Sequence, residues 1–261
     1  MKKLTLILFI LLLAGCGKVK VEEKIIEKED VMLGASASFV QYIDKTPVGS
    51  ANTATTTPIN TTTGNFLAVI VEGFGGNSVV TGVTDTAGNT YKKAIGAWKI
   101  NGAERSEIWY TENITGNANN VVTATYTGSL SFRYISVAEF SGIALSNSFV
   151  SSSTKINSSV KYHSSASSTS SNIGDIIVGG YNGLNVYDIT NGSGFTTLSS
   201  DNTSVYYYAE YKILGAVGIY GADCFSSTSN SSVMVSAIFA VASGSSPPIS
   251  SSVESDIIFF D

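Results

Sequence analysis

Few side chains in this sequence of 261 residues could act together as nucleophile and base. The only histidine, His163, stands among serines in Lys161-Tyr162-His163-Ser164, which predicts a loop. A catalytic serine needs a base beside it, and the Gly-x-Ser-x-Gly turn of many serine hydrolases does not occur in the sequence. We therefore predict no catalytic triad.

Paired carboxylates are the second chemistry to consider. Glycoside hydrolases need two carboxyl groups about 5 to 9 Å apart across a sugar-binding cleft. Glu104, Glu107 and Glu112 lie close in the sequence, but spacings of three and five residues put neighbours on opposite faces of a regular strand. A pair from separate strands, such as Glu139 with Glu210, stays open. A divergent glycoside hydrolase is therefore an alternative to the non-catalytic function that we predict.

Metal ligands are scarce. Apart from Cys16, which is discussed below, only His163 and Cys224 could offer the nitrogen and sulfur ligands of a zinc site, so we predict none. Asp85 and Asn89 in the turn Asp-Thr-Ala-Gly-Asn could contribute oxygens to a structural Ca²⁺ site, although Ca²⁺ takes about six oxygens or more. The alternative is that both residues form an ordinary turn. We predict no other cofactor.

Aromatic side chains are the tools for binding that this sequence offers. Trp98 and Trp109 are the two tryptophans, and Tyr206, Tyr207, Tyr208 and Tyr211 share one predicted strand. Alternate residues of a strand face opposite sides, so one set of these tyrosines can enter the core while the other faces outward. Exposed rings stack on sugar faces or on protein partners, whereas buried rings only supply packing area. The candidate ligand-binding residues are Trp98, Trp109, Tyr206 and Tyr208.

Strands must position these residues. From Ala35 onward, short runs rich in Val, Ile, Thr, Tyr and Phe alternate with Gly, Asn, Ser and Asp clusters. Aromatic residues at 10%, charged residues at 13% and 25 glycines fit strands joined by tight turns. We predict about a dozen strands, at 36–43, 65–72, 78–84, 90–99, 105–112, 120–127, 132–140, 148–154, 175–181, 195–199, 204–214 and 232–241.

The two halves of the chain resemble each other at an offset of about 100 residues. Segment 63–69 matches 173–178, segment 109–112 matches 208–211, and segment 136–140 matches 235–239. Such a weak repeat predicts an antiparallel two-sheet sandwich with pseudo-symmetric halves. The serine-rich stretches 148–172 and 243–252 are typical of linkers.

The segments Val-Thr-Asp-Thr-Ala-Gly-Asn-Thr-Tyr, Glu-Ile-Trp-Tyr-Thr-Glu-Asn and Val-Ala-Glu-Phe-Ser-Gly give residues 35–242 a resemblance to secreted bacterial jelly-roll sandwiches of the concanavalin-like kind. The resemblance implies an all-β jelly-roll sandwich and a tendency to bind sugars or surfaces. Sandwich glucanases of this shape carry a Glu-x-Asp-x-x-Glu strand, from which this sequence departs.

The beginning of the chain predicts export. Lys2 and Lys3 precede an apolar block, 4–13, which is shorter than the roughly 20 residues of a membrane-spanning helix. The block ends in Leu13-Ala14-Gly15-Cys16, which resembles the lipobox of bacterial lipoproteins. That resemblance implies removal of residues 1–15, attachment of lipid to Cys16, and anchoring in a membrane of the cell envelope, with more than one acyl chain for stable binding.

The remaining segments follow from this prediction. Residues 16–34 form a lipidated, charged tether, residues 35–242 the β-sandwich domain, and residues 243–261 a Ser/Pro linker with a hydrophobic tail. Lipid on Cys16 leaves Cys224 without an intramolecular disulfide partner, so we predict that Cys224 is buried or, as the alternative, pairs between chains. A net charge of −5 argues against nucleic acid as a partner; the local basic patch consists only of Lys92, Lys93, Lys99 and Arg105.

Three functions are compatible with these features. The one we favour is a lipid-anchored envelope or cell-surface module that binds carbohydrate or another surface polymer without catalysis. The second is a structural or adhesive lipoprotein that contacts protein partners, and the third is the divergent glycoside hydrolase. Exposed Trp98 and Trp109 on one face would support the first, whereas two carboxyls meeting in a groove would support the third. The sequence leaves the oligomeric state open.

Overall fold

The computed structural model describes residues 36–47, 49–75, 78–99, 104–186, 188–198 and 205–243. The predicted signal peptide, Cys16, the predicted tether and residues 244–261 of the predicted tail lie outside these ranges. Within them the chain forms eighteen strands and no helix, and every strand pairing between them is antiparallel. The prediction of an all-β, antiparallel sandwich is confirmed, although about a dozen strands was too few.

The first half of the chain builds two facing sheets. The larger one, here called the first central sheet, has the order β1-β10-β4-β7-β6. Its strands are β1 (Ser38–Lys45), β10 (Phe132–Ser141), β4 (Phe66–Phe74), β7 (Glu104–Thr111) and β6 (Lys92–Lys99). The smaller sheet has the order β2-β9-β5, beside the pair β3-β8. Its strands and the pair are β2 (Ala51–Thr55), β9 (Val122–Leu130), β5 (Val80–Asp85), β3 (Ile59–Thr61) and β8 (Asn117–Asn120).

The second half repeats this plan. Its large sheet, the second central sheet, has the order β11-β18-β13-β16-β15, and β14 pairs with β18. The strands are β11 (Phe149–Ser164), β18 (Asp223–Phe239), β13 (Ile176–Val186), β16 (Val205–Ile213), β15 (Thr196–Thr197) and β14 (Thr190–Asn191). The pair β12-β17 joins Ser168–Thr169 to Ile219–Tyr220. Strands β11 and β18 continue past bulges beyond the second central sheet. In this continuation His163 lies opposite Cys224.

Backbone hydrogen bonds confirm the internal repeat. Gly64 and Gly174 both have positive φ angles, 85° and 92°, in the turns that precede β4 and β13. The amide of Gly64 donates to the carbonyl of Ile114 at 2.9 Å, and that of Gly174 donates to the carbonyl of Leu214 at 2.8 Å. A positive φ suits glycine because it lacks a Cβ atom. The two halves therefore share both their strand order and their turn geometry.

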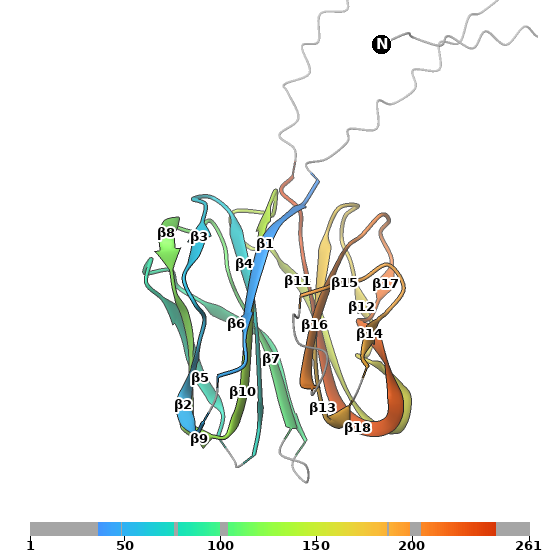
Figure 1. Cartoon of the computed structure of the whole chain (residues 1–261). Helices are drawn as coiled ribbons and strands as arrows, with labels where there is room; N and C mark the ends of the chain where they lie inside the picture. The colour runs from blue at the N-terminus through green and yellow to red at the C-terminus, as the bar shows by residue number, and fades with distance from the viewer. Residues whose placement is uncertain are drawn as a thin grey trace, which may run out of the picture. The chain divides into compact units, whose positions relative to one another are not determined.

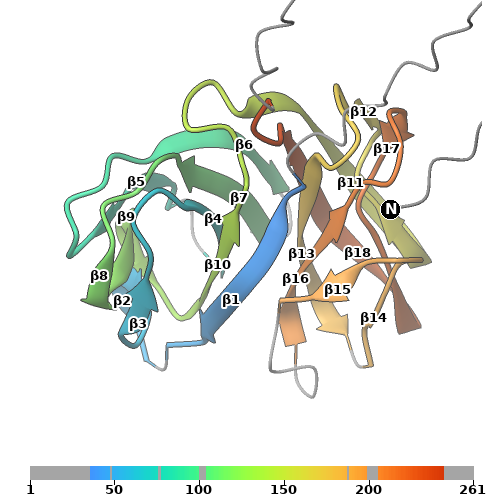
Figure 2. The same ribbon diagram turned by 90° about the horizontal axis from the view of Figure 1, so that it is seen from above.

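The two central sheets face each other across the largest core cluster (Figures 1 and 2). Phe66, Ile70 and Phe140 from the first sheet share this cluster with Val178 and Phe239 from the second. A second cluster fills the space between the first central sheet and β2-β9-β5, and a third lies on the outer face of the second central sheet. Both central sheets are thus covered on both faces, which explains unbroken apolar runs such as Phe-Leu-Ala-Val-Ile-Val in β4.

The predicted serine-rich linker 148–172 is wrong. Most of it forms β11, a strand of sixteen residues, and β12. Its serines are tolerated inside because their hydroxyls pair: Ser153 Oγ lies 2.9 Å from Ser236 Oγ, and Ser165 Oγ lies 3.0 Å from Ser236 Oγ. Polar residues that satisfy one another in this way do not show the alternation from which strands are predicted.

The described chain begins and finishes at the same end of the sandwich (Figure 1). Ser38 pairs with Ser141 where β1 begins, and Val241 bridges Ile143 just after β18 ends. We call this the entry end; it also carries loops 142–148, 170–175 and 214–218. The opposite, far end is where β4 finishes at Phe74, opposite Glu104 of β7 and Phe132 of β10.

Candidate functional site

The outer face of β6 and β7 gathers the two tryptophans. Register pairs Trp98 with Arg105, Gly96 with Glu107 and Lys93 with Trp109, and a bulge lies between Lys93 and Ile95. The alternate residues of β7, Ile108 and Tyr110, enter the core between the central sheets. Arg105, Glu107 and Trp109 therefore face the other way, together with their partners on β6. Strand β6 is the edge of its sheet, and this face is only partly covered. Lys93 and Gly96 are exposed, whereas Trp98 and Trp109 are half-buried and Trp109 packs against the second core cluster.

A pocket of about 150 Å³ opens on this face; it is lined by Val79, Lys93, Gly96, Ala97, Trp98, Arg105 and Glu107. Enclosed ligand sites commonly hold about 300 to 1,000 Å³, so this one suits a single ring or a small group rather than a large ligand. Trp109 adjoins the pocket through Lys93, whose Nζ lies 5.8 Å from the centre of the indole ring. Gly96 is a lining residue without a side chain. We call this the Trp98 pocket.

The polar groups of the pocket are held by one another. Lys93 Nζ lies 2.9 Å from Glu107 Oε2, and Trp109 donates its indole N–H to the same oxygen at 2.9 Å. Lys93 is 42% exposed and Glu107 only 7%, so the pair presents its ammonium to solvent. Glu107 is the only carboxylate in the lining. The arrangement can stack a flat ring and hydrogen-bond hydroxyls, but it lacks the second carboxyl of a glycoside hydrolase.

Trp98 makes a cation–π contact with Arg105. The guanidinium carbon of Arg105, a residue only 2% exposed, lies 5.5 Å from the centre of the Trp98 ring. The Trp98 indole N–H is covered and has no hydrogen-bond acceptor among the residues that the structure describes. Trp98 and Trp109, two of the predicted binding residues, thus lie on one face with charged groups between them.

Tyr208 does not belong to this face or to any open surface. It is 2% exposed in the core cluster on the outer face of the second central sheet, and its hydroxyl lies 2.9 Å from Thr197 Oγ1. Its neighbour Tyr207 points into the core between the central sheets. The prediction that one set of these tyrosines faces outward is wrong for Tyr208, because this sheet is covered on both sides. The side chain of Tyr206 lies outside the described residues.

Asp85 and Asn89 do come together. Asp85 accepts hydrogen bonds from the Asn89 amide at 2.9 Å, Asn89 Nδ2 at 2.8 Å, Tyr91 Oη at 2.9 Å and Asn120 Nδ2 at 3.0 Å. Burial alone would raise the pKa of Asp85, but these hydrogen bonds outweigh it and lower the pKa. The geometry is that of the turn alternative. No group of three or more His, Cys, Asp or Glu side chains in the described part could hold a metal, and Ca²⁺ here remains a prediction.

The pair Glu139 and Glu210 is not formed. Glu139 accepts hydrogen bonds from the Thr62 amide at 2.8 Å and from Asn65 Nδ2 at 2.6 Å, on the outer side of the first central sheet. Glu210 accepts from the Asp223 amide at 3.0 Å, on the outer side of the second central sheet. The core between the two central sheets separates them.

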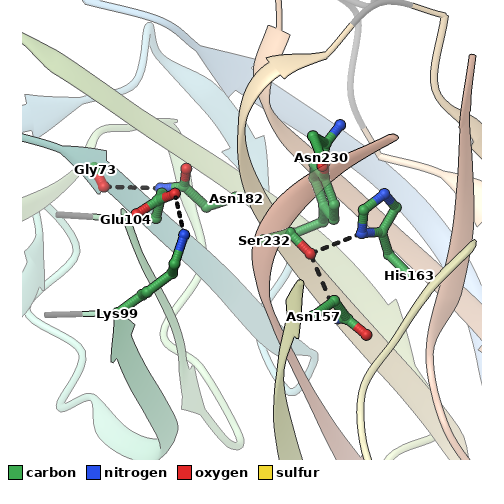
Figure 3. A network of polar contacts seen from close by, with 9 residues as sticks. Gly73, Lys99, Glu104, Asn157, His163, Asn182, Asn230 and Ser232 are labelled. Carbon is green, nitrogen blue, oxygen red and sulfur yellow. Dashed lines mark hydrogen bonds and ion pairs between the residues drawn. The ribbon is translucent and has the colours of Figure 1, made fainter. Parts of the chain in front are cut away.

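Two other glutamates do approach each other, and sequence reasoning missed them. Glu72 lies opposite Ser106 and Glu104 lies opposite Phe74, so both carboxylates share the inner face of β4 and β7 at diagonal positions about 7–8 Å apart. Ser106 Oγ donates to Glu72 Oε1 at 2.9 Å. Lys99 Nζ lies 3.2 Å from Glu104 Oε1 (Figure 3). Both glutamates are 0% exposed. They meet between two sheets rather than in a groove, where no sugar could reach them.

Burial raises the pKa of Glu72 well above its ordinary value, although hydrogen bonds from Ser106 and from backbone amides oppose the shift. The folded protein therefore keeps this carboxyl protonated at pH values where the unfolded chain is ionised, and stability is lost as pH rises above about 4.5. Glu72→Gln, which mimics the protonated form, should increase the free energy of unfolding at pH 7 and leave it nearly unchanged at pH 4. Urea titration at both pH values tests this; an equal effect at both would contradict it.

His163 is a buried strand residue, so the predicted loop is wrong. It is 0% exposed, and Nδ1 lies 2.8 Å from Ser232 Oγ (Figure 3). Nε2 lies 3.0 Å from Ser226 Oγ. Tyr181 packs edge-on against it, with ring centres 5.0 Å apart. Desolvation lowers the pKa of His163 to about 4. The hydroxyls hold a neutral imidazole in the core, where no substrate has access.

Cys224, opposite His163, is buried, which confirms the favoured prediction for this residue. The neighbouring Phe225 is instead 51% exposed and pairs with Tyr162, which is 49% exposed, at a ring-centre distance of 5.5 Å. Sequence reasoning missed this pair because both residues fall in stretches rich in serine. It forms an exposed aromatic surface in the second half of the chain.

Comparisons with protein-family models, with curated proteins and with solved structures find no match for this chain. In the ranges that the structure covers, no helix is long and apolar enough to cross a membrane.

Proposed function

We propose that this chain is a lipid-anchored module of the bacterial envelope that binds carbohydrate, without catalysis, through the Trp98 pocket. The observation that carries the proposal is the placement of the half-buried Trp98 and Trp109 and the Lys93–Glu107 pair on one partly exposed face of β6 and β7. Sugar rings present apolar C–H faces to aromatic rings and hydroxyls to charged groups, and this face offers partners for both.

The charges favour an uncharged sugar. Each of the three lysines on β6 is paired with a glutamate: Lys92 with Glu112 at 2.8 Å, Lys93 with Glu107 at 2.9 Å and Lys99 with Glu104 at 3.2 Å. An acidic polymer would gain little from cations that are already neutralised. We therefore expect neutral polysaccharides to bind in preference to uronic-acid or phosphate polymers.

Filling the pocket tests the proposal without removing an aromatic ring. A Cβ atom at Gly96 would meet Lys93 Cε and Nζ at 2.7 Å, which are the mobile end of a flexible side chain. It would also lie 3.1 Å from Glu107 Cγ. Gly96→Val should therefore fold normally, fill part of the pocket and weaken binding to a neutral glycan by about tenfold or more. A glycan array followed by calorimetry on the best ligand measures the change.

Gly82→Val is the matched control. Gly82 is also a strand glycine, on β5, and a Cβ atom there would meet nothing within 4 Å. It should bind as the unmodified protein does. Equal affinity of the Gly96→Val variant, or a folded protein that binds no glycan on the array, would rule out the Trp98 pocket as a sugar site.

The lipid anchor has a separate test. Cells fed labelled fatty acid should incorporate the label into the chain through Cys16, and Cys16→Ser should abolish incorporation. Label that persists in the variant would contradict the anchor and leave the sugar-binding proposal untouched.

Adhesion to a protein surface is a second candidate function, favoured by the exposed pair Tyr162 and Phe225. Aromatic side chains are enriched in the centres of protein interfaces. If this function is the correct one, the double variant Tyr162→Ser/Phe225→Ser should reduce adhesion of protein-coated beads, whereas Gly96→Val should not.

A further inference from the structure

Large apolar side chains are exposed at the entry end of the sandwich. Ile219 is 73% exposed, Ile173 64%, Leu145 57% and Val217 56%. They come from three segments that are far apart in the sequence, and we call these four residues the apolar tip. Exposed hydrophobic residues scattered singly need no explanation, but a group at one end of a domain marks a contact surface.

Hydrogen bonds hold these segments together. Ser170 donates its amide to the carbonyl of Gly218 at 2.9 Å, and Gly174 donates to Leu214 at 2.8 Å, which ties the turn around Ile173 to the loop that carries Val217. The segment of Leu145 is linked to the same place, because Ala144 donates to Ala240 at 3.0 Å and Val241 donates to Asp175 Oδ1 at 3.1 Å. The apolar tip is therefore a surface of fixed shape.

These segments contain no charge. Residues 142–148 read Gly-Ile-Ala-Leu-Ser-Asn-Ser, residues 170–174 read Ser-Ser-Asn-Ile-Gly, and residues 214–222 read Leu-Gly-Ala-Val-Gly-Ile-Tyr-Gly-Ala. Asp175, which follows, is 0% exposed. Tyr220 adds an aromatic ring, whose hydroxyl donates to the carbonyl of Ala216 at 2.7 Å. The nearest charged pair is Lys92 with Glu112, which accepts a hydrogen bond from the Ser148 amide. Apolar side chains with a nearby tyrosine suit the boundary between lipid headgroups and acyl chains.

The position of the apolar tip selects its partner. The described chain starts at Ser36 at this same end, so the residues that lead back to Cys16 join the sandwich here (Figure 1). A bilayer that held Cys16 would lie within reach of the entry end, because the twenty residues 16–35 are the whole connection. We propose that the apolar tip docks on the lipid bilayer and fixes the sandwich upright, with its far end outward. This inference rests on the proposed lipid anchor.

Tryptophan fluorescence on vesicles tests the docking. Lipidated Ile219→Trp protein is reconstituted in phosphatidylethanolamine–phosphatidylglycerol vesicles whose acyl chains carry bromine near the headgroup, a short-range quencher. The signal of Trp98 and Trp109 is subtracted with the unmodified protein. We expect the added fluorescence to be largely lost in brominated vesicles and retained in ordinary ones.

Phe132→Trp is the matched control at the far end, where Phe132 is 43% exposed. It should not be quenched. Equal quenching of both variants would overturn upright docking, and quenching of neither in vesicle-bound protein would overturn docking while the lipid anchor stands. Protein that does not sediment with vesicles and takes up no labelled fatty acid would overturn both. Binding of the apolar tip to a protein partner would appear as unquenched fluorescence on pure lipid.

Discussion

Gly180→Ala should destabilise the sandwich by about 3 kcal/mol. A Cβ atom at Gly180 would lie 2.7 Å from Ser106 Oγ, 2.8 Å from Ile70 Cγ2 and 3.2 Å from Glu72 Oε1. All three belong to the opposite central sheet, so the added carbon would push the two halves of the chain apart. It would also disturb the hydrogen bond that Ser106 donates to the buried Glu72 carboxyl.

Thermal unfolding measures this effect, with an expected fall in Tm of about 6 to 12 °C for a domain of this size. Gly82→Ala provides the control for the intrinsic difference between glycine and alanine in a strand, since its surroundings are open. The truncation Ile70→Ala removes one of the colliding atoms, so the double variant should be less destabilised than the sum of the two single variants. Additive effects would show that the collision does not limit stability.

Acid should weaken the fold through His163 by on the order of 3 kcal/mol between pH 6.5 and pH 4. The unfolded chain binds a proton near pH 6.5, whereas desolvation lowers the pKa of the folded residue to about 4. Stability from the neutral ring is therefore complete above pH 6.5 and is lost as pH falls. Tyr181 and Cys224 beside the ring have pKa values raised by burial, so they stay neutral throughout this range.

His163→Gln isolates this contribution, because glutamine cannot take up the proton. The difference in unfolding free energy between the unmodified protein and the variant, measured by urea titration, should shrink as pH falls from 6.5 to 4. Carboxyls with raised pKa values, such as Glu72 and Glu210, act in the opposite direction but cancel in the difference. A difference that does not change with pH would show that His163 titrates normally.

Much of the fold was predictable, and the exceptions have a common cause. All twelve predicted strands overlap strands of the structure, because Val, Ile, Tyr and Phe mark them. The prediction missed β2, β3, β8, β12, β14 and β17, together with the outer portions of β11 and β18. Apart from β17, which is Ile-Tyr, these segments are rich in Thr, Ser, Asn and Ala. They form strands because they pair with a neighbouring segment, not because of their own strand preference. The jelly-roll connectivity implied by the resemblance remains a prediction.

The candidate site was predictable only in part. Tryptophan as a binding residue follows from its chemistry, but the common face of Trp98 and Trp109 depends on the register of β6 with β7 and on the bulge after Lys93. The prediction that Tyr208 is exposed was wrong because strand alternation indicates which face of the sheet a residue lies on. It does not indicate whether another layer covers that face. The Glu72–Glu104 pair and the cage around His163 both arise from pairings between distant segments, which one sequence does not reveal.

The placement of the Trp98 pocket and of Ser36 has a mechanical consequence. Trp98 lies where β6 ends, near the far end, whereas the chain joins β1 at the entry end. A pull between a bound polymer and an anchored N-terminus would run along the strands. The backbone hydrogen bonds that join β1 to β10, from Ser38 to Lys45, would then bear the load in shear, all at once instead of one after another. Bonds loaded together in this way resist force better than bonds that break one after another.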